Sequence, residues 1–316
     1  MGGLAARERR APARKRARGA PAERGATAPG RRYEVAQRHD AYAPAEHDTW
    51  GQLLARTEAL VRRHEGRLHP AYVEGFRRLV LPWKRIPRLD RVNAALAPFG
   101  WKTLCVNGYL PPEVYSGLLA RGVFPISREI RAREQVEFSP TPDLAHDMLG
   151  HIPMLVSAEY RRYLRCISRA TAAAPSGPLD RELFLAHRML GVLHGTPLRR
   201  RRALAAVAAR VQAAQAALAA APSRLAQLDR LYLWSVEFGL MGTPDDFRIY
   251  GAALLSSPAE AEALCTKGAP LVTFSAAVTQ RAIHFSEYQS AYFIARDYAQ
   301  LHDVLSDVQS SWRDAG

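Results

Sequence analysis

The sequence predicts an α+β domain that is predominantly α-helical and carries a few short strands. Three observations support this class. Residues 50–61 repeat apolar side chains near the 3.6-residue period of a helix. Residues 203–221 are dominated by alanine, which has the highest helix propensity. Two short apolar runs, 122–126 and 135–138, are the best candidates for strands.

The first third of the chain is expected to be mostly helical. Folding is predicted to begin between Tyr33 and Trp50, with Asp48 as the N-cap of the first helix. The helical pattern continues to about residue 100. Residues 106–112 (VNGYLPP) predict a loop, because Asn-Gly and Pro-Pro both disfavour regular structure.

Helices are expected to dominate the later part of the chain as well. One helix is predicted to start at Asp143, because Pro142 ends what precedes it and an aspartate suits the first turn. Residues 155–225 predict long helices, and residues 287–312 predict a closing helix.

Charge distinguishes a basic N-terminal arm from the rest of the chain. Residues 1–32 hold ten Lys or Arg against two Glu, which is +8 of the formal net charge of +14, and contain no aromatic side chain. We expect this arm to be disordered, and nucleic-acid binding by it is the less favoured interpretation. Residues 33–316 are expected to form a single catalytic domain.

Composition also sets the expected compartment. No run of about 18 apolar residues is present, so no membrane span is expected. The basic N-terminus is not followed by an apolar segment, which argues against a secretory signal. Three widely spaced cysteines, Cys105, Cys166 and Cys265, do not predict a disulfide framework. We therefore predict a cytoplasmic protein with no membrane partner.

A pair of histidines and a distant glutamate form the strongest functional signal. His146 and His151 lie in residues 142–153 (PDLAHDMLGHIP), and Glu237 lies in the apolar run 232–240 (YLWSVEFGL). A carboxylate in such a run must be paired, protonated or metal-bound. Two imidazoles and one carboxylate on one face of Fe(II) leave other positions open for O₂ or substrate, which suits an oxygenase.

Other interpretations stay open on these residues alone. A zinc-dependent hydrolase could use the same ligands, although zinc proteases separate their histidines by four residues rather than five. Five residues turn an α-helix by about 140°, so the pair converges only where the helix loosens or ends near the second histidine, as Gly150 and Pro153 would allow. The histidines could also be core residues, or the protein could be non-catalytic and bind nucleic acid through its arm.

Four separated segments resemble the pterin-dependent aromatic amino acid hydroxylases. In the family's order they are residues 106–112, 140–151, 236–240 and 249–257. The likeness is greatest to the bacterial phenylalanine 4-monooxygenase type. The resemblance implies an aromatic amino acid hydroxylase-like catalytic domain, with the iron and pterin site formed by about residues 105–260.

The resemblance implies a reaction that uses two cofactors. His146, His151 and Glu237 would hold Fe(II), and a tetrahydropterin, either tetrahydrobiopterin or a bacterial analogue, would supply two electrons. O₂ would be the co-substrate, and the other substrate would be a free aromatic amino acid, most simply L-phenylalanine hydroxylated to L-tyrosine. Pterin-recycling enzymes would then be functional partners.

The resemblance also implies a pterin site built from a loop, an aromatic ring and an acid. Backbone groups of the loop would hydrogen-bond the heterocycle, the ring would stack on it, and the acid would reach it through water. The matching positions are Gly108, Tyr109 and Leu110 in the loop, the ring of Tyr115, the acid Asp147, and Tyr232 beside the iron.

A second set of positions matches the family's substrate site. Arg131 would bind the amino acid's carboxylate, because a guanidinium fork suits that planar anion, and Asp143 would orient it. Ser256 would steady His146. The remaining positions expected at the substrate pocket are Ser139, Pro142, Leu233 and Phe238.

Two substitutions leave the identity of the substrate open. Leu233 stands where many relatives carry a pocket Trp, and Ala253 stands where they carry Gly. A tryptophan hydroxylase or a phenylalanine meta-hydroxylase of the same family therefore stays an alternative to phenylalanine 4-hydroxylation.

Overall fold

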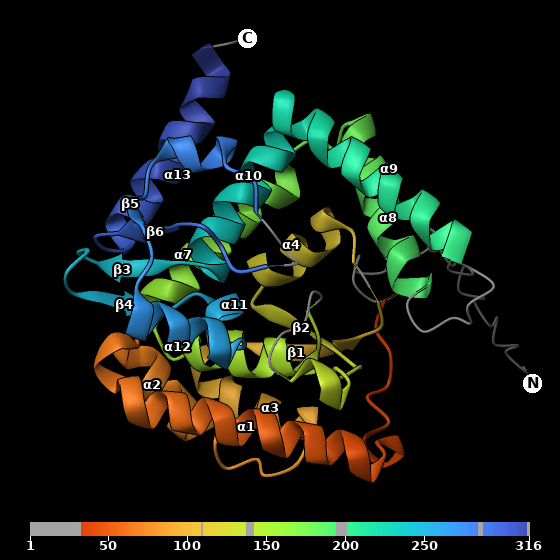
Figure 1. Cartoon of the computed structure of the whole chain (residues 1–316), viewed down its shortest axis with the longest axis vertical. Helices are drawn as coiled ribbons and strands as arrows, with labels where there is room; N and C mark the ends of the chain where they lie inside the picture. The colour runs from red at the N-terminus through yellow and green to blue at the C-terminus, as the bar shows by residue number, and fades with distance from the viewer. Residues whose placement is uncertain (1–32, 109, 137–141, 194–200, 284–286, 315–316) are drawn as a thin grey trace, which may run out of the picture.

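The structure confirms the predominantly helical class (Figure 1). It is a computed structural model that describes residues 33–108, 110–136, 142–193, 201–283 and 287–314, so the predicted arm 1–32 lies outside the described residues. The α-helices are α1 (Pro44–His64), α2 (Pro70–Gly75), α3 (Leu89–Leu96), α4 (Pro112–Ala120), α5 (Leu144–His146), α6 (Ile152–Met154), α7 (Ala158–Ala173), α8 (Pro178–Leu193), α9 (Arg201–Ala220), α10 (Arg224–Tyr232), α11 (Ala252–Leu255), α12 (Pro258–Lys267) and α13 (Tyr298–Asp314).

Short 3₁₀ and π-helical turns connect many of these helices. The 3₁₀ turns are η1 (His39–Ala41), η2 (Glu65–Arg67), η4 (Ala97–Phe99), η5 (Arg133–Gln135) and η9 (Ala276–Gln280). The π-helical turns are η3 (Phe76–Val80), η6 (Asp147–His151) and η8 (Leu233–Glu237). Turns of the π type occur mostly inside α-helices and often at functional sites.

The strands form two small sheets. In the first, β1 (Lys102–Val106) and β2 (Val123–Ser127) are parallel, and α4 is the crossover between them. The second has the order β4-β3-β6-β5, with β3 (Leu240–Gly242) antiparallel to β4 (Phe247–Ile249). In the same sheet, β6 (Tyr292–Ala295) is parallel to both β3 and β5 (Leu271–Thr273).

The first helix starts earlier than the sequence indicated. Pro44 is the first residue of α1, the N-cap is Ala43, and the Glu46 carboxylate accepts the Ala43 N–H at 2.7 Å. The prediction of Asp48 as N-cap was therefore wrong, because the proline and the glutamate fix the helix start one turn upstream. The buried face of α1 still follows the helical period from Trp50 to Val61.

Two other boundaries differ from the prediction. The run 135–138 is not a described strand, because Gln135 ends the 3₁₀ turn η5 and residues 137–141 lie outside the described residues. The closing helix begins at Tyr298 rather than near 287, because residues 292–295 are all buried and complete the second sheet as β6. The strand predicted at 122–126 and the helix predicted at 203–221 are confirmed as β2 and α9.

One large hydrophobic core joins the helical layer of α1–α3, the central α7 and the second sheet. Its aromatic members bring together segments that are far apart in the sequence. Its largest fully buried side chains include Trp50, Tyr72, Phe76, Phe124, Tyr160, Tyr163, Tyr250 and Phe274.

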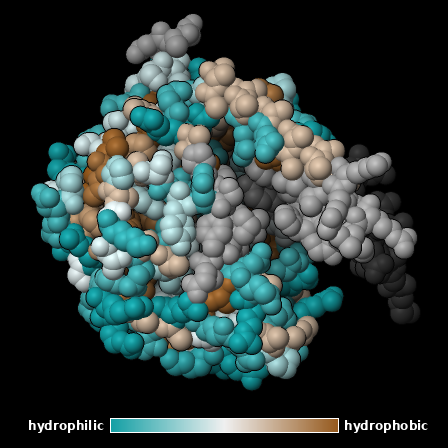
Figure 2. Space-filling view, viewed as in Figure 1, coloured by the Kyte–Doolittle hydropathy of each residue, from teal (hydrophilic) through white to brown (hydrophobic). Residues whose placement is uncertain are grey.

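The helices α8 and α9 lie side by side at one edge of the molecule (Figure 1). They pack through a small separate cluster of Ala186, Val207 and Val211. The opposite face of α9 is largely exposed alanine, which gives this edge its weakly hydrophobic colour in Figure 2. Among the described residues, no helix is both long and apolar enough to span a bilayer.

Candidate active site

A π-helical turn brings the two predicted histidines together. Asp143 is the N-cap of α5, and its carboxylate accepts the His146 N–H at 2.9 Å. The chain then enters η6, where the Ile152 N–H bonds to the carbonyl of Asp147, five residues back. Residues five apart are thereby brought close to one face. The loosening expected near Gly150 is thus present as a π turn.

A second π-helical turn carries the glutamate. Glu237 is the last residue of η8, and the Phe238 N–H bonds to the Leu233 carbonyl, again five residues back, at 2.9 Å. A Cβ added at Gly251 would lie 2.5 Å from the Glu237 carbonyl oxygen, and one added at Gly150 would lie 2.5 Å from a carbonyl oxygen of the same 251–252 segment. These two glycines let both ligand-bearing turns pack closely against the start of α11.

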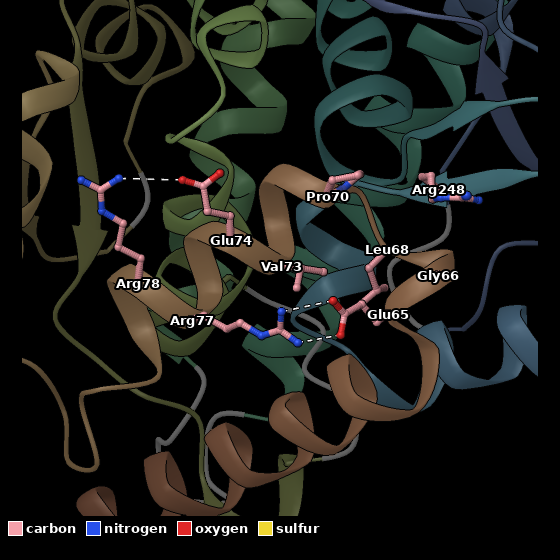
Figure 3. A pocket seen from close by; sticks show the side chains of 9 residues that line it. All are labelled: Glu65, Gly66, Leu68, Pro70, Val73, Glu74, Arg77, Arg78 and Arg248. Atoms are coloured by element: carbon pink, nitrogen blue, oxygen red, sulfur yellow. Dashed lines mark hydrogen bonds and ion pairs between the residues drawn. The ribbon is translucent and has the colours of Figure 1, made fainter.

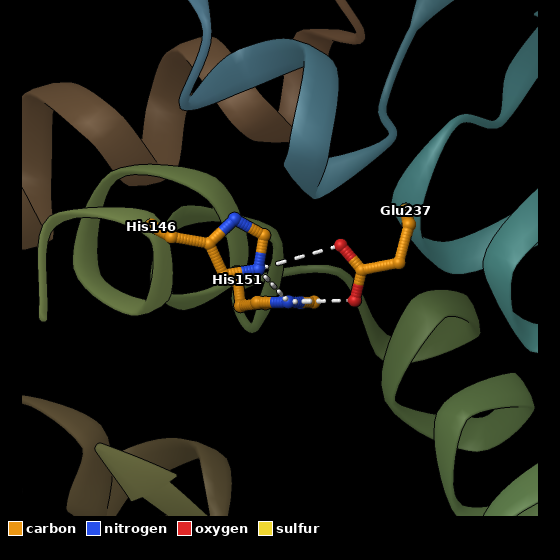
Figure 4. A group of neighbouring side chains, drawn as sticks. All are labelled: His146, His151 and Glu237. Carbon is orange, nitrogen blue, oxygen red and sulfur yellow. Dashed lines mark hydrogen bonds and ion pairs between the residues drawn. The ribbon is translucent and has the colours of Figure 1, made fainter. Parts of the chain in front are cut away.

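His146, His151 and Glu237 converge on one point (Figure 4). The Nε2 atoms of the two histidines are 3.2 Å apart. Nε2 of His151 lies 3.1 Å from Oε1 of Glu237, and Nε2 of His146 lies 3.4 Å from its Oε2. All three residues are buried, and His151 is fully enclosed.

The electrostatics of this triad favour the protonation states that metal binding requires. Burial lowers the pKa of His146 to about 4, although Glu237 opposes this shift. Burial also opposes ionisation of Glu237, but His151 and His146 together outweigh it and lower the pKa of that carboxyl. At neutral pH His146 is therefore neutral and Glu237 is an anion, as metal ligands must be.

The triad fits a metal ion on two observations. Oε2 of Glu237 is buried and has no hydrogen-bond partner among the described residues, so one strong acceptor is left for another group. Three ligand atoms that are each about 2.1 Å from one ion lie roughly 3.0–3.4 Å from one another, for right-angled or tetrahedral coordination. The two histidine nitrogens, 3.2 Å apart, fall in this range, and each of them lies 3.1–3.4 Å from a different oxygen of the Glu237 carboxylate. Geometry alone therefore supports a metal but does not separate iron from zinc.

The outer nitrogen of each histidine meets a hydroxyl group. Nδ1 of His146 lies 2.9 Å from Oγ of Ser256, and Nδ1 of His151 lies 3.3 Å from the hydroxyl of Tyr160. Such partners fix the orientation of a metal-binding imidazole. The ring of Phe124 packs against His151 with centroids 4.9 Å apart. The sequence analysis did not predict Tyr160 or Phe124 as site residues. The sequence shows only that Phe124 is an aromatic residue in a predicted strand and that Tyr160 follows the histidine motif in a predicted helix.

Arg131 and Asp143 form a buried ion pair beside the triad. Nε and Nη2 of Arg131 donate to the two carboxylate oxygens at 3.0 and 2.8 Å, and the Arg131 backbone N–H donates to Oδ2 at 2.6 Å. Nη1 lies 3.5 Å from the Ser256 carbonyl oxygen. Because Asp143 caps the helix of His146 and Ser256 contacts its ring, the guanidinium is linked to the triad from two sides.

The positions expected for the pterin are only partly in contact with one another. Leu110 is buried in a small cluster with Val106, and Tyr115 lies between this cluster and the main core. The hydroxyl groups of Tyr115 and Tyr232 are 3.2 Å apart. Gly108 has a left-handed backbone (φ 71°), which suits the tight loop predicted there.

Asp147 and Tyr109 complete the expected pterin set. Asp147 is buried, its Oδ2 accepts the Ser127 N–H at 2.7 Å, and burial raises its pKa to about 7. Tyr109 lies outside the described residues.

The expected ring-pocket positions that the structure describes adjoin the ligand-bearing segments in the sequence. Leu233 is the first residue of η8 and is half-buried, and Phe238 directly follows Glu237, the last residue of this turn, and is buried. Pro142 directly precedes Asp143 and is exposed. Ser139 lies outside the described residues.

A cleft of about 690 Å³ elsewhere on the molecule is not a rival site (Figure 3). Arg77 donates to both oxygens of Glu65 at 3.1 and 2.6 Å, and Arg78 lies 3.8 Å from Glu74. These four charged side chains that line the cleft therefore largely pair with one another. Among the described residues, the cluster able to hold a metal is the triad and lies outside this cleft.

Comparison with known proteins identifies a single family of aromatic amino acid hydroxylases. The family model described as biopterin-dependent aromatic amino acid hydroxylase matches residues 31–185 and 181–313. Phenylalanine-4-hydroxylase of Chromobacterium violaceum is 28% identical over 277 residues, which cover 87% of this chain and 77% of that protein. The enzyme of the same name from Ralstonia nicotianae is 28% identical over 267 residues, which cover 83% and 70%.

Solved structures agree with this result. The crystal structure of Chromobacterium violaceum phenylalanine hydroxylase with bound iron(III) and oxidised 7,8-dihydrobiopterin matches with a TM-score of 0.68 at 27% identity. The match covers 90% of this chain and 87% of that one.

Proposed function

Because this chain belongs to the biopterin-dependent aromatic amino acid hydroxylase family, we propose that it hydroxylates free L-phenylalanine to L-tyrosine. The family is biopterin-dependent, and the His-His-Glu triad is consistent with an iron site. When bound, Fe(II) and tetrahydropterin supply the electrons and the site at which O₂ is activated. The specific substrate and the roles of the surrounding residues are the proposal.

We assign the metal to His146, His151 and Glu237. Their Nε2 atoms and carboxylate oxygens face one another, and hydroxyl groups hold the outer nitrogens of both histidines. Three protein ligands on one side leave the remaining positions of the metal open, as an oxygenase needs.

We assign the substrate's carboxylate to Arg131. Asp143 engages the edge of the guanidinium formed by Nε and Nη2, and one hydrogen of Nη1 faces the Ser256 carbonyl, so the second hydrogens of Nη1 and Nη2 remain to bind a carboxylate. Ser256 joins this guanidinium to the ring of His146. An amino acid held there by its carboxylate would lie close to the metal. This linkage between a buried arginine and the triad is the observation that carries the proposal.

We assign the substrate ring and the pterin to the two flanks of the triad. Leu233, Phe238 and Pro142 would line the ring pocket, with Ser139 nearby. Tyr115 would stack on the pterin beside the loop of Gly108, Tyr109 and Leu110, with Asp147 and Tyr232 completing that side. We also propose that the protein works in the cytoplasm beside an enzyme that reduces the oxidised pterin.

The test is to incubate iron-loaded protein with tetrahydrobiopterin, O₂ and each aromatic amino acid, and to identify the products by mass and retention. We expect tyrosine from phenylalanine, and no product when the pterin is omitted. A meta-hydroxylated phenylalanine or hydroxytryptophan as main product would overturn the substrate and select the alternative left open by Leu233 and Ala253. No pterin-dependent oxidation of any aromatic amino acid would overturn the whole proposal.

A further inference from the structure

The helix α7 carries two buried tyrosines whose hydroxyl groups contact the turns that bear His151 and Glu237. Tyr160 and Tyr163 are three residues apart, so they lie on one face of the helix, and both are fully enclosed. Their hydroxyl groups reach two different segments, one in η6 and one in η8, and these are the turns that end at His151 and Glu237.

The first contact satisfies the outer nitrogen of a ligand. A histidine that binds a metal through Nε2 carries its proton on Nδ1 and needs an acceptor for it. His151 is fully enclosed, and its Nδ1 lies 3.3 Å from the Tyr160 hydroxyl. Because that proton would otherwise be buried without an acceptor, loss of the hydroxyl should weaken metal binding rather than leave it unchanged.

The second contact holds the turn that carries Glu237. The Tyr163 hydroxyl donates to Oγ of Ser235 at 2.9 Å, and Ser235 in turn donates to the Leu231 carbonyl at 2.6 Å. Ser235 lies two residues before Glu237 in η8. Tyr163 therefore acts on the carboxylate ligand only through the backbone of this turn.

The helix α7, which carries both tyrosines, is held in place by its N-cap and by packing against other helices. Ser157 is the N-cap of α7 and accepts the Tyr160 N–H at 3.1 Å. The helix packs against α4, α10 and α13. Its two hydroxyl groups are therefore presented at fixed positions.

We propose that Tyr160 and Tyr163 are positioning residues for the metal centre, which α7 braces by contacting the His151 ligand and the Glu237 turn at once. Tyr160 acts directly by accepting the Nδ1–H of His151, and Tyr163 acts indirectly by holding Ser235. The proposal rests on the proposed metal site but not on the identity of the amino acid substrate.

The test uses Co(II) alone as the probe of the metal-free protein. Its d–d absorption reports the ligand field, and its titration reports affinity without any turnover. Tyr160→Phe removes one oxygen atom, and we expect Co(II) affinity to fall about 10-fold or more, with shifted d–d bands. Tyr163→Phe should weaken Co(II) binding less, with a smaller band shift.

Tyr292→Phe is the matched control. Tyr292 is also a buried tyrosine, and its hydroxyl donates to Glu260 at 2.6 Å rather than to a triad residue. This variant should lose stability while its Co(II) affinity and spectrum stay as in the wild type. If Tyr160→Phe does not fold, 3,5-difluorotyrosine at position 160, measured at a pH where its phenol stays protonated, keeps the hydroxyl but makes its oxygen a poorer acceptor, and a smaller band shift in the same direction is expected.

The outcomes separate this proposal from the one it rests on. Wild-type protein that binds no Co(II) at the triad would overturn the metal site itself. Wild-type binding with unchanged affinity and bands in Tyr160→Phe would overturn the brace and leave the metal site intact. An equal loss of affinity in Tyr292→Phe would show that general destabilisation is the cause, which also overturns the brace.

Discussion

Replacing Asp143 should destabilise the protein far more than replacing a surface aspartate. The side chains of Arg131 and Asp143 are 3% and 8% exposed, and from the described residues the carboxylate accepts four hydrogen bonds, three from Arg131 and one from the His146 N–H. Asp143→Ala leaves a buried guanidinium without its counter-ion, which costs about 3–5 kcal/mol. It also removes the N-cap of α5, which costs about 1 kcal/mol.

A second variant separates these two effects. Asparagine caps a helix as well as aspartate does but carries no charge, so Asp143→Asn should be about 1 kcal/mol more stable than Asp143→Ala. Urea unfolding of the metal-free proteins measures the difference, provided that the m value is unchanged. Asp246→Ala is the control, because Asp246 is an exposed partner of Arg248 and its loss should have little effect. A cost below about 1 kcal/mol for Asp143→Ala would refute the buried-pair reasoning.

Four further predictions follow from the same geometry. Glu237→Ala should lose iron and activity together, because two histidines hold Fe(II) poorly; stoichiometric iron in the purified variant would contradict the ligand assignment. Arg131→Ala leaves the buried Asp143 carboxylate unpaired and should also cost stability, but in the enzyme that stays folded it should mainly raise the apparent KM for the amino acid, by about 10–100-fold for a lost charge-assisted bond of roughly 1.5–3 kcal/mol, and an unchanged KM would remove this residue from the site. Ser256→Ala should weaken Fe(II) binding about 10-fold, because Nδ1 of His146 loses its partner, and an equilibrium titration that finds wild-type affinity would reject that role. Glu260 has a pKa that burial raises, so the folded state favours its neutral form, and stability should be lost as pH rises from about 4.3 through the raised pKa; Glu260→Gln should flatten this part of a stability–pH curve, and a parallel curve would contradict it.

Much of the fold followed from local sequence signals. The helical period around Trp50, the alanines of α9 and the proline before Asp143 each predicted a helix that is present. The boundaries that failed depend on tertiary pairing. Residues 292–295 are a strand because β3 and β5 lie on either side of them, and no local pattern shows those neighbours.

In the site, too, local sequence signals predicted some features, whereas others depend on tertiary packing. The two histidines could be paired from their spacing together with Gly150, because they converge only where the helix loosens or ends, and the structure shows a π turn there. Tyr160 could not be found in this way, because its contact with His151 depends on where α7 packs. The second ligand-bearing π turn at Leu233–Glu237 was also invisible in the sequence, since an apolar run does not distinguish π from α geometry.

The most direct test of the account is a crystal structure of the protein loaded anaerobically with Fe(II). We expect one iron within about 2.0–2.3 Å of Nε2 of His146, Nε2 of His151 and a carboxylate oxygen of Glu237, with the positions opposite these ligands held by water. Iron bound elsewhere, or either imidazole turned away from the carboxylate, would contradict it.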